Sequence, residues 1–326
     1  MVKLCSKIVI EGSRRWVFTS VVNCSITEDT DSLTDTCTIE LPKKARWEGH
    51  PIGAGDNPPL KRGDKISVYL GYDDDLKVRF LGYIRRVSAS VPVKLECEDG
   101  MFLLKLTPAQ KKGFKEVSLD TLIKTLLEGT GIKYALIDKT IALGPYRITR
   151  DTVAEELAEL QKTVGLMAYF RRINNETMLY AGFTYPFDGR QKGHFIHGKN
   201  IISNELEYRR AEDIKLKVKA ISILPDNQRI EMEVGDKDGE LRTAYKYNVN
   251  RNDLKVFATG ELERFKYSGY QGSFETFGEP AVGKTDIAHV EGEDGNRGDY
   301  LIKKVEINFG TGGYRQKIAL GPVISV

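Results

Sequence analysis

Apolar and polar residues alternate along the first third of the chain, which is the pattern of half-buried β-strands. The alternating segments are rich in β-branched residues, and turn-rich stretches separate them without helical spacing. They are Lys7–Ile10, Trp16–Phe18, Val22–Ile26, Thr36–Leu41, Ile66–Leu70, Lys77–Leu81 and Val93–Glu98. Short strands without crossover helices predict a small antiparallel barrel or sandwich over residues 1–106.

A loop from Pro42 to Pro59 interrupts these strands. It is rich in glycine and also contains Pro51 and Pro58. Because the backbone groups of such a loop cannot all pair internally, we expect it to be exposed to solvent or bound to a neighbouring molecule.

Helical spacing appears in the next part of the chain, 107–202. Leucine and isoleucine recur at positions that predict a helix over 119–127. A second helix is predicted to begin at Thr152, which forms a capping box with Glu155, and to end at Gly165. With the strand-like segments around them, these helices predict a compact α/β module.

Strand-like alternation returns over 203–326. In 214–223, Lys215, Lys217 and Lys219 alternate with apolar residues, which predicts a strand with one buried face and one basic, solvent-exposed face. The other predicted elements are a helix over 253–266 and a final hairpin that joins 300–309 to 314–320.

The two β regions repeat one pattern. In each, a glycine turn leads into a strand, a second strand carries two adjacent basic residues before a valine, and an alternating third strand follows. The matching stretches are Leu60–Glu98 and Pro280–Gly321. We therefore predict a mainly β fold in which two related small antiparallel β-barrels flank a compact α/β module. The predicted domains are 1–106, 107–202 and 203–326.

Composition describes an ordinary globular protein. The chain has 326 residues, of which 40% are hydrophobic and 29% are charged, with a formal net charge of +3. Both signs are mixed along the chain without a basic, aromatic-rich stripe, so nucleic acid is not expected as a partner. No apolar run is long enough to cross a bilayer, so we expect no membrane span.

The four cysteines lie in strand-like segments of the first third, at Cys5, Cys24, Cys37 and Cys97. Cys24 and Cys37 could face each other across a hairpin. Nothing in the sequence indicates export, so we expect buried reduced thiols.

One segment matches a nucleotide-binding motif. Gly278–Thr285 fits G-x-x-x-x-G-K-[ST], in which backbone amides and the lysine hold a phosphate. The motif needs a long helix directly after the loop, whereas this chain soon reaches the polar, glycine-rich stretch 291–298. We therefore expect Lys284 to lie in a turn that leads into a strand.

Other candidate chemistry is sparse. His194 and His197 could supply two metal ligands, but no nearby cysteine or carboxylate pair completes a ligand set, and the glycines around them predict a surface loop. No catalytic carboxylate pair and no nucleophile motif emerges. We expect no catalytic residue, no metal and no cofactor.

The C-terminal hairpin, Gly298–Gly321, resembles the end of phage late control protein D, the baseplate hub of contractile tails. Asp35–Pro42, Lys61–Asp64 and Phe80–Tyr83 are similar to the first barrel of that family, and the middle block is similar in kind to the domain inserted between its barrels. The resemblance implies a homotrimer in which two related barrels per subunit form a ring of pseudo-sixfold symmetry. Such a symmetry adaptor would match a hexameric tail tube on one side and a trimeric central spike on the other.

The resemblance also implies a relationship to the hub part of type VI secretion spike proteins. It implies synthesis in the bacterial cytoplasm and assembly into a phage tail or injection particle. The tail tube protein, a separate spike protein and the tape-measure protein are the expected partners.

The first hypothesis is therefore a structural hub, not an enzyme. For each of the candidate interface residues named at the end of this paragraph, the alternative is that it lies in an ordinary exposed loop or strand face without a partner. The other hypotheses are a tail-associated enzyme (a cell-wall hydrolase or an NTPase built on Gly278–Thr285) and a carbohydrate-binding module at a tail tip. The candidate interface residues are Pro51, Pro58, Pro59, His194, His197, Lys215, Lys217 and Lys219.

Overall fold

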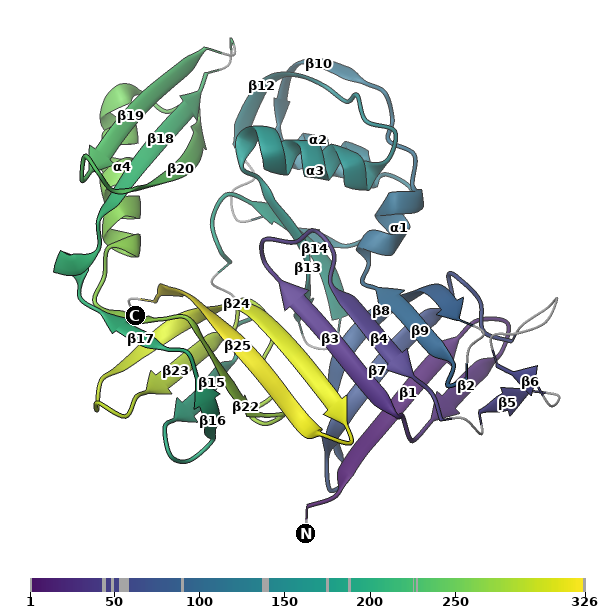
Figure 1. The fold of residues 1–326 in the computed structure, drawn as a ribbon. Coiled ribbons are helices and arrows are strands. Elements are labelled where there is room, and N and C mark those ends of the chain that lie inside the picture. The colour runs from purple at the N-terminus through teal and green to yellow at the C-terminus, as the bar shows by residue number, and fades with distance from the viewer. Residues whose placement is uncertain are drawn as a thin grey trace.

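In the computed structural model, one largely antiparallel sheet built from both ends of the chain forms the base of the molecule (Figure 1). The structure describes residues 2–324 except 43–44, 48–49, 53–58, 89–90, 137–140, 174–175, 187–188, 225 and 227. The N-terminal strands are β1 (Leu4–Glu11), β2 (Arg15–Phe18), β3 (Asn23–Asp29), β4 (Thr36–Glu40), β7 (Lys65–Tyr72), β8 (Asp75–Ser88) and β9 (Lys94–Glu98), with a small hairpin of β5 (Arg46–Trp47) and β6 (His50–Pro51). The C-terminal strands are β15 (Lys192–Ile196), β16 (Ile201–Asn204), β17 (Glu207–Arg209), β21 (Gly269–Gln271), β22 (Ser273–Phe277), β23 (Ile287–Glu291), β24 (Arg297–Gly310) and β25 (Gly313–Val323).

The two β units join through β3 and β24. These strands pair antiparallel from Asp29 opposite Lys304 to Asn23 opposite Gly310. The sheet order is β16-β22-β25-β24-β3-β4-β9-β8-β7-β1-β2, with β23 beside β24 and β15 beside β23. Because alternate side chains of each strand point inward, apolar residues from both units form one buried cluster.

This architecture confirms the mainly β fold with an α/β module between two β units. It corrects the prediction that each β unit closes into a barrel. Among the described strand pairs, β2 and β16 are the ends of one open sheet. Each unit uses an edge strand to join the other unit, so that edge is not available to close a barrel.

The α/β module contains α1 (Met101–Leu106), β10 (Gly113–Ser118), α2 (Leu119–Leu127), β11 (Tyr134–Ala135), β12 (Ala142–Arg147), α3 (Val153–Val164), β13 (Met167–Ile173) and β14 (Glu176–Gly182). The predicted capping box is present: Thr152 Oγ1 accepts from the Glu155 amide, and the Glu155 carboxylate accepts from the Thr152 amide. Gly165 ends α3 at a φ of +71°, a left-handed conformation that favours glycine. The apolar faces of α1, α2 and α3 share a second core.

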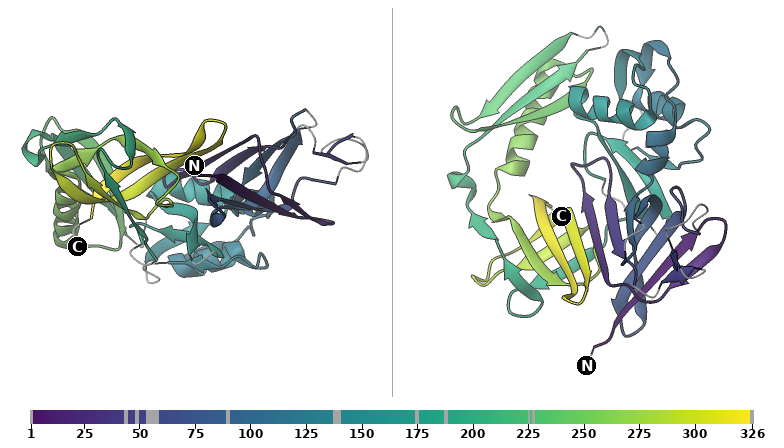
Figure 2. Two further views of the ribbon diagram at one scale, coloured as in Figure 1. Left: turned by 90° about the horizontal axis from the view of Figure 1, so that it is seen from below. Right: turned by 45° about the vertical axis from the view of Figure 1, so that its right-hand side comes forward.

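A third, smaller module follows β17. It consists of a 3₁₀ helix (Ala211–Asp213), β18 (Leu216–Ile223), β19 (Arg229–Gly235), β20 (Glu240–Tyr247) and α4 (Arg251–Phe265). Its core packs Leu216 and Val218 of β18 against Leu254 and Ala258 of α4. Figures 1 and 2 show both modules above the large sheet, on the same side of it.

The domain boundaries at 106 and 202 remain predictions, and we propose slightly earlier ones. Met101 and Leu104 of α1 belong to the core of the α/β module. Strands β15 and β16 belong to the large sheet with the C-terminal unit. Boundaries near the starts of α1 and β15 would therefore follow the packing.

The predicted repeat extends to backbone conformation. Gly63 and Thr285 both have positive φ, +94° and +70°. Each donates its amide hydrogen, at 2.8 Å, to a backbone carbonyl of the second strand that follows it. The acceptor is Ile84 for Gly63 and Ile302 for Thr285, and these two residues are equivalent in the repeat. A β-branched residue at positive φ is costly, so the second unit keeps this turn without the glycine that usually permits it.

The aspartate after each of these residues repeats the match. Asp64 accepts from the Lys61 amide and Asp286 from the Gly283 amide, both at 2.8 Å and both from three residues upstream. The two turns thus carry the same internal hydrogen bond.

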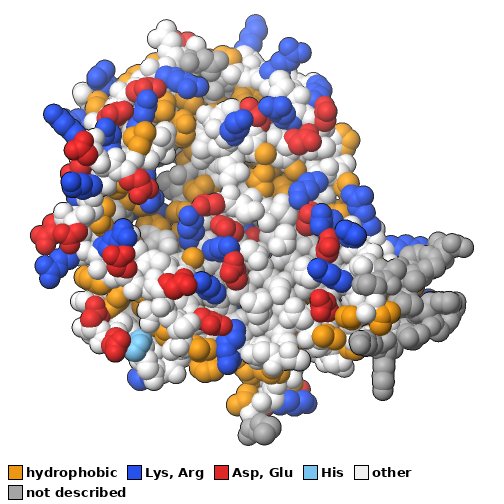
Figure 3. All heavy atoms as spheres, viewed as in Figure 1, with side chains coloured by type: hydrophobic (Ala, Val, Ile, Leu, Met, Phe, Trp, Pro, Cys, Tyr) orange, Lys and Arg blue, Asp and Glu red, His pale blue; other side chains and the backbone are white. Residues whose placement is uncertain are grey.

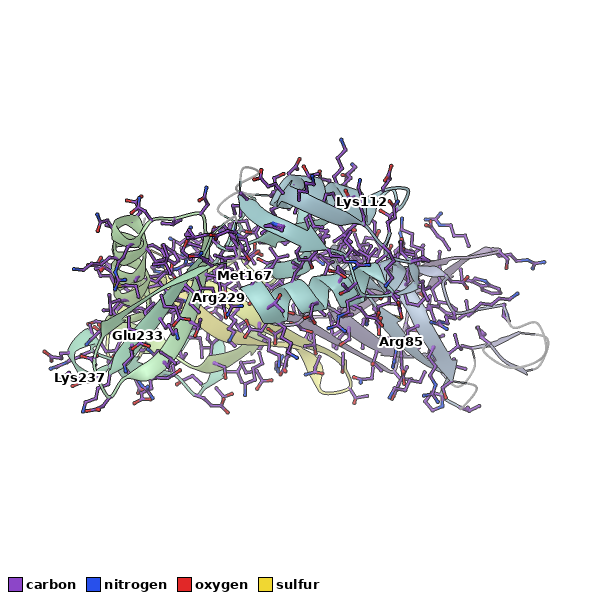
Figure 4. The ribbon with its side chains drawn as sticks, turned by 90° about the horizontal axis from the view of Figure 1, so that it is seen from above. Arg85, Lys112, Met167, Arg229, Glu233 and Lys237 are labelled. Atoms are coloured by element: carbon purple, nitrogen blue, oxygen red, sulfur yellow. The ribbon has the colours of Figure 1, made fainter. Side chains whose placement is uncertain are left out.

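The long central strands β8 and β24 repeat the same irregularity. Each has 14 residues. Each pairs with the following strand through a bulge at the first of its two adjacent basic residues, Arg85 or Lys303. Arg85 is labelled in Figure 4. A bulge bends a strand and re-aims the residues beyond it, so both units bend at the same point.

Candidate interaction surfaces and a buried charged junction

Lys284, the lysine of the nucleotide-binding motif, lies in a buried junction between the two β units. Its Nζ is 2.7 Å from Oδ1 of Asp35, and the two side chains are 3% and 9% exposed. The Lys284 amide donates to Oε2 of Glu28 at 3.1 Å. A buried ammonium requires a partner of this kind because burial removes its hydration.

The carboxyl groups around Lys284 are perturbed by their surroundings. Burial raises the pKa of Asp35 to about 8, although the positive charge of Lys284 acts in the opposite direction. Burial also raises the pKa of Asp99 to about 6, although the positive charge of Lys284 again acts to lower it. Asp99 accepts from the backbone amides of Asp35 and Met101. The Asp99 carboxyl group therefore ties the start of the α/β module to the N-terminal unit.

The α/β module contributes further partners from β13. The ring of Tyr169 lies 4.9 Å from Lys284 Nζ, a geometry that favours a cation–π interaction. Arg171 Nε donates to Thr285 Oγ1 at 2.9 Å, and Arg172 lies 3.7 Å from Glu28. All three units therefore meet around Lys284 and Thr285.

A cavity of about 670 Å³ opens beside this junction. Its walls carry both acidic and basic side chains and come from β8, β13 and the segment before β23. Arg79 of β8 is buried and donates from Nη2 to the Val282 carbonyl at 2.9 Å and to Oε1 of Gln316 at 3.1 Å. The guanidinium thus holds the segment before Lys284 against the N-terminal unit.

This geometry confirms that Gly278–Thr285 is a turn leading into a strand. The next described element is β23, a strand, where a phosphate-binding loop would begin a helix. Lys284 is already paired inside the protein. Sequence reasoning missed Asp35 as its partner and also missed Asp99 and Arg171 in the same junction, since only the folded chain brings them together.

The proline loop lies only partly among the described residues. Pro58 falls outside them, as do most of its neighbours. Pro51 belongs to the short hairpin of β5 and β6, so the segment predicted as a loop contains two short strands. Pro59 is half-buried. Contact through these prolines stays a prediction.

The two histidines do not converge on one site. His194 lies on β15, which pairs parallel with β23, so this part of the predicted surface loop is a strand. The centroid of its ring lies 5.1 Å from that of His289, and the two ring planes are tilted by 51°. His197, beyond the strand, lies 3.7 Å from Glu293. Within the described ranges, no group of three or more His, Cys, Asp or Glu side chains could hold a metal ion.

The lysines of β18 do not form the basic, fully exposed face that the alternation predicts. Lys219 Nζ is 2.6 Å from Glu231 and Lys217 Nζ is 3.9 Å from Glu233, both on the neighbouring strand β19. Figure 4 labels Glu233. Of the three predicted lysines, only Lys215, which directly precedes β18, is mostly exposed. Cross-strand acids neutralise this face because opposite charges pair across neighbouring strands.

The surface is mixed in charge elsewhere too. On the face shown in Figure 3, Lys and Arg side chains are interspersed with Asp and Glu. None of the helices in the described part of the chain is both long and apolar enough to span a membrane. The four cysteines are free and buried, as predicted, with the Cys24 and Cys37 sulfurs 3.9 Å apart.

Comparison with known proteins identifies the fold. No family model and no curated protein matches the sequence. Among solved structures, a tail protein from Neisseria meningitidis is 14% identical with a TM-score of 0.65 over 97% of this chain and 96% of the other. The 43 kDa tail protein of prophage MuSo2 from Shewanella oneidensis is 16% identical with a TM-score of 0.62 over 97% of both chains. An E. coli type VI secretion component, described as structurally similar to T4 tail proteins, is 12% identical with a TM-score of 0.59 over 97% of this chain and 76% of its own.

At these identities the likeness is one of fold. The chain shares its whole architecture with structural proteins of phage tails and with a type VI secretion component. The resemblance to tail hub proteins expected from the sequence is confirmed at that level.

Proposed function

We propose that this chain is a structural hub of a contractile phage tail or related injection system and has no catalytic role. Three copies form a ring that joins a hexameric tail tube to a trimeric central spike. The tube protein, the spike protein and a tape-measure protein are its partners within the particle.

The internal repeat is the observation that carries this proposal. The same turn, aspartate hydrogen bond and bulge recur in both β units. Three chains, each with two such units, offer about six similar surfaces, which is what an adaptor between sixfold and threefold partners needs. The shared fold with phage tail proteins supports the same placement.

Size-exclusion chromatography with light scattering tests the trimer. We expect a mass of about three times 36.7 kDa for the purified protein, or for the protein co-expressed with the tube and spike proteins of its own particle. A single-chain mass under both conditions, at the highest concentration reached, would contradict the proposal.

Three assays test the competing hypotheses. Nucleotide binding by calorimetry that is lost in Lys284→Ala would favour an NTPase, and the buried ion pair with Asp35 argues against it. Clearing of purified peptidoglycan would favour a hydrolase. Binding on a glycan array would favour a carbohydrate-binding module.

A further inference from the structure

Because the two β units are repeated, every strand at their junction corresponds to a strand of the other unit. In the N-terminal unit, Val87 of β8 lies opposite Leu95 of β9, Leu95 opposite Ile39 of β4, and Ile39 opposite Cys24 of β3. Val87 is the second residue after the bulge at Arg85. This ladder of four strands ends at β3.

The C-terminal unit contains the same ladder. Val305, the second residue after the bulge at Lys303, lies opposite Ile318 of β25. Ile318 lies opposite Phe274 of β22, and Phe274 opposite Asn204 of β16. Strands β16 and β17 therefore correspond to β3, and β21 and β22 correspond to β4. The small module with α4 occupies the place of the β3–β4 turn.

Because the units are repeated, each of the two strand edges that meet at the junction has an equivalent edge in the other unit. Within one chain, only one of these two pairs of edges is joined. The part of β24 beyond its bulge pairs with β3, which places Val305 opposite Glu28 and Phe309 opposite Cys24. The equivalent edges are the part of β8 beyond Arg85, on the side of β7, and the outer edge of β16 and β17. Among the described strand pairs, neither of these two edges has a partner strand.

Burial follows the same division. Val305 is 0% exposed at the occupied junction, whereas its equivalent Val87 is only partly buried. Glu28 of β3 is 8% exposed, whereas its equivalent Tyr208 of β17 is 37% exposed. An apolar or aromatic side chain is thus partly uncovered at each unoccupied edge, and the equivalent position is covered where the same edges meet.

We propose that the outer edge of β16 and β17 in one copy of this chain pairs with β8 of a second copy, beyond Arg85, in an antiparallel register that places Tyr208 opposite Val87. The proposal rests on the proposed ring and specifies the strands that close it. The occupant is a second copy because the intrachain β3–β24 junction is built from equivalent edges. Since the contact joins two different edges, each added copy leaves one of each edge free, and the assembly closes only as a ring.

The charges at one end of this register are compatible with it. The equivalents of the Asp29–Lys304 pair are Arg209 and Arg86, which carry the same sign. Arg209 is compensated within its own strand by Glu207, at 2.6 Å. Like charges directly opposite would oppose pairing, so this internal ion pair reduces the repulsion at the contact.

Disulfide trapping tests the register. The variant Val87→Cys/Tyr208→Cys places two thiols at directly opposite cross-strand positions, close enough for a disulfide after mild oxidation. The control is Ser88→Cys/Tyr208→Cys, in which the first thiol lies one residue away and on the opposite face of its strand. The native cysteines are buried. We expect covalent two-chain and three-chain species in the first variant, with no larger species, and single chains in the control.

A second pair of variants does not depend on disulfide formation. Tyr208→Glu should shift the mass measured by light scattering from three chains towards one. Val256→Glu, at a 72% exposed position of α4, should leave it unchanged, and circular dichroism should show both variants folded. The proposed edges are wrong if the protein has a three-chain mass but shows no specific cross-linking, or if Tyr208→Glu leaves the three-chain mass unchanged. In both cases the proposed trimer still stands. A single-chain mass without cross-linking overturns both.

Discussion

Replacing Lys284 by methionine tests whether the junction stabilises the fold. The substitution keeps the length of the side chain and removes the ammonium 2.7 Å from Asp35. Removing one partner of a buried ion pair leaves an uncompensated charge and costs about 3–5 kcal/mol of unfolding free energy. The matched control is Lys303→Met, because Lys303 lies 2.6 Å from Asp31 and the two side chains are 42% and 62% exposed. Loss of an exposed pair costs about 0.2–1 kcal/mol.

The loss at Lys284 should depend on pH. Burial already raises the pKa of Asp35 to about 8 in the folded protein, and removal of the ammonium raises it further. An unfolded aspartate has a pKa of about 3.9, so the folded variant binds a proton that the unfolded chain releases. Its unfolding free energy is therefore highest below about pH 4 and falls as the pH rises towards 8. In the unaltered protein Asp35 also keeps its proton up to about pH 8, so the deficit should stay nearly constant below that pH and grow above it, where Asp35 ionises beside Lys284 but stays protonated in the variant.

Differential scanning calorimetry at several pH values measures both effects. The double variant Asp35→Leu/Lys284→Met should recover much of the loss at neutral pH, because it also removes the buried carboxyl group that Lys284→Met leaves without its partner. Equal losses for Lys284→Met and Lys303→Met would refute the reasoning. So would a Lys284→Met deficit that shrinks as the pH rises above about 8.

Three smaller predictions concern local structure, and thermal or urea unfolding measures each. Gly63→Ala should cost about 1–2 kcal/mol because its φ is +94° although its surroundings are open, whereas Gly113→Ala, also in open space but without positive φ, should be neutral or slightly stabilising. Thr152→Ala removes the cap of α3 and should cost about 1 kcal/mol, while Thr152→Ser should restore most of it. Leu254→Ala, at a fully buried position of α4, should cost about 2–5 kcal/mol, and Val256→Ala on its exposed side should change little.

Signals carried within a few residues of sequence predicted the structure well. The capping box at Thr152 and Glu155 and the end of α3 at Gly165 lie where the sequence places them. The nucleotide-binding motif was correctly predicted to be a turn, because its own flanks lacked the required helix. The repeat was visible because glycine turns and paired basic residues mark backbone features that both units need.

Contacts between distant segments could not be predicted in this way. Asp35 and Lys284 are 249 residues apart, and neither has a local pattern that names the other. Alternation of period two specifies which face of a strand is buried and leaves its neighbour open, so the pairing of β3 with β24 was missed and closed barrels were expected instead. Strand β15 was missed for a related reason, because the glycines that flank it are also typical of a loop.

The common side occupied by the two modules gives the molecule a direction. A pair of repeated β units alone would have two similar ends, and a ring made from them could be stacked either way up. Here the α/β module and the α4 module both stand above the large sheet (Figures 1 and 2). A ring of such chains whose axis runs along this direction would carry the modules on one rim and only the large sheet on the other. A partner that threads or stacks along its axis would meet a different surface according to the end from which it arrives.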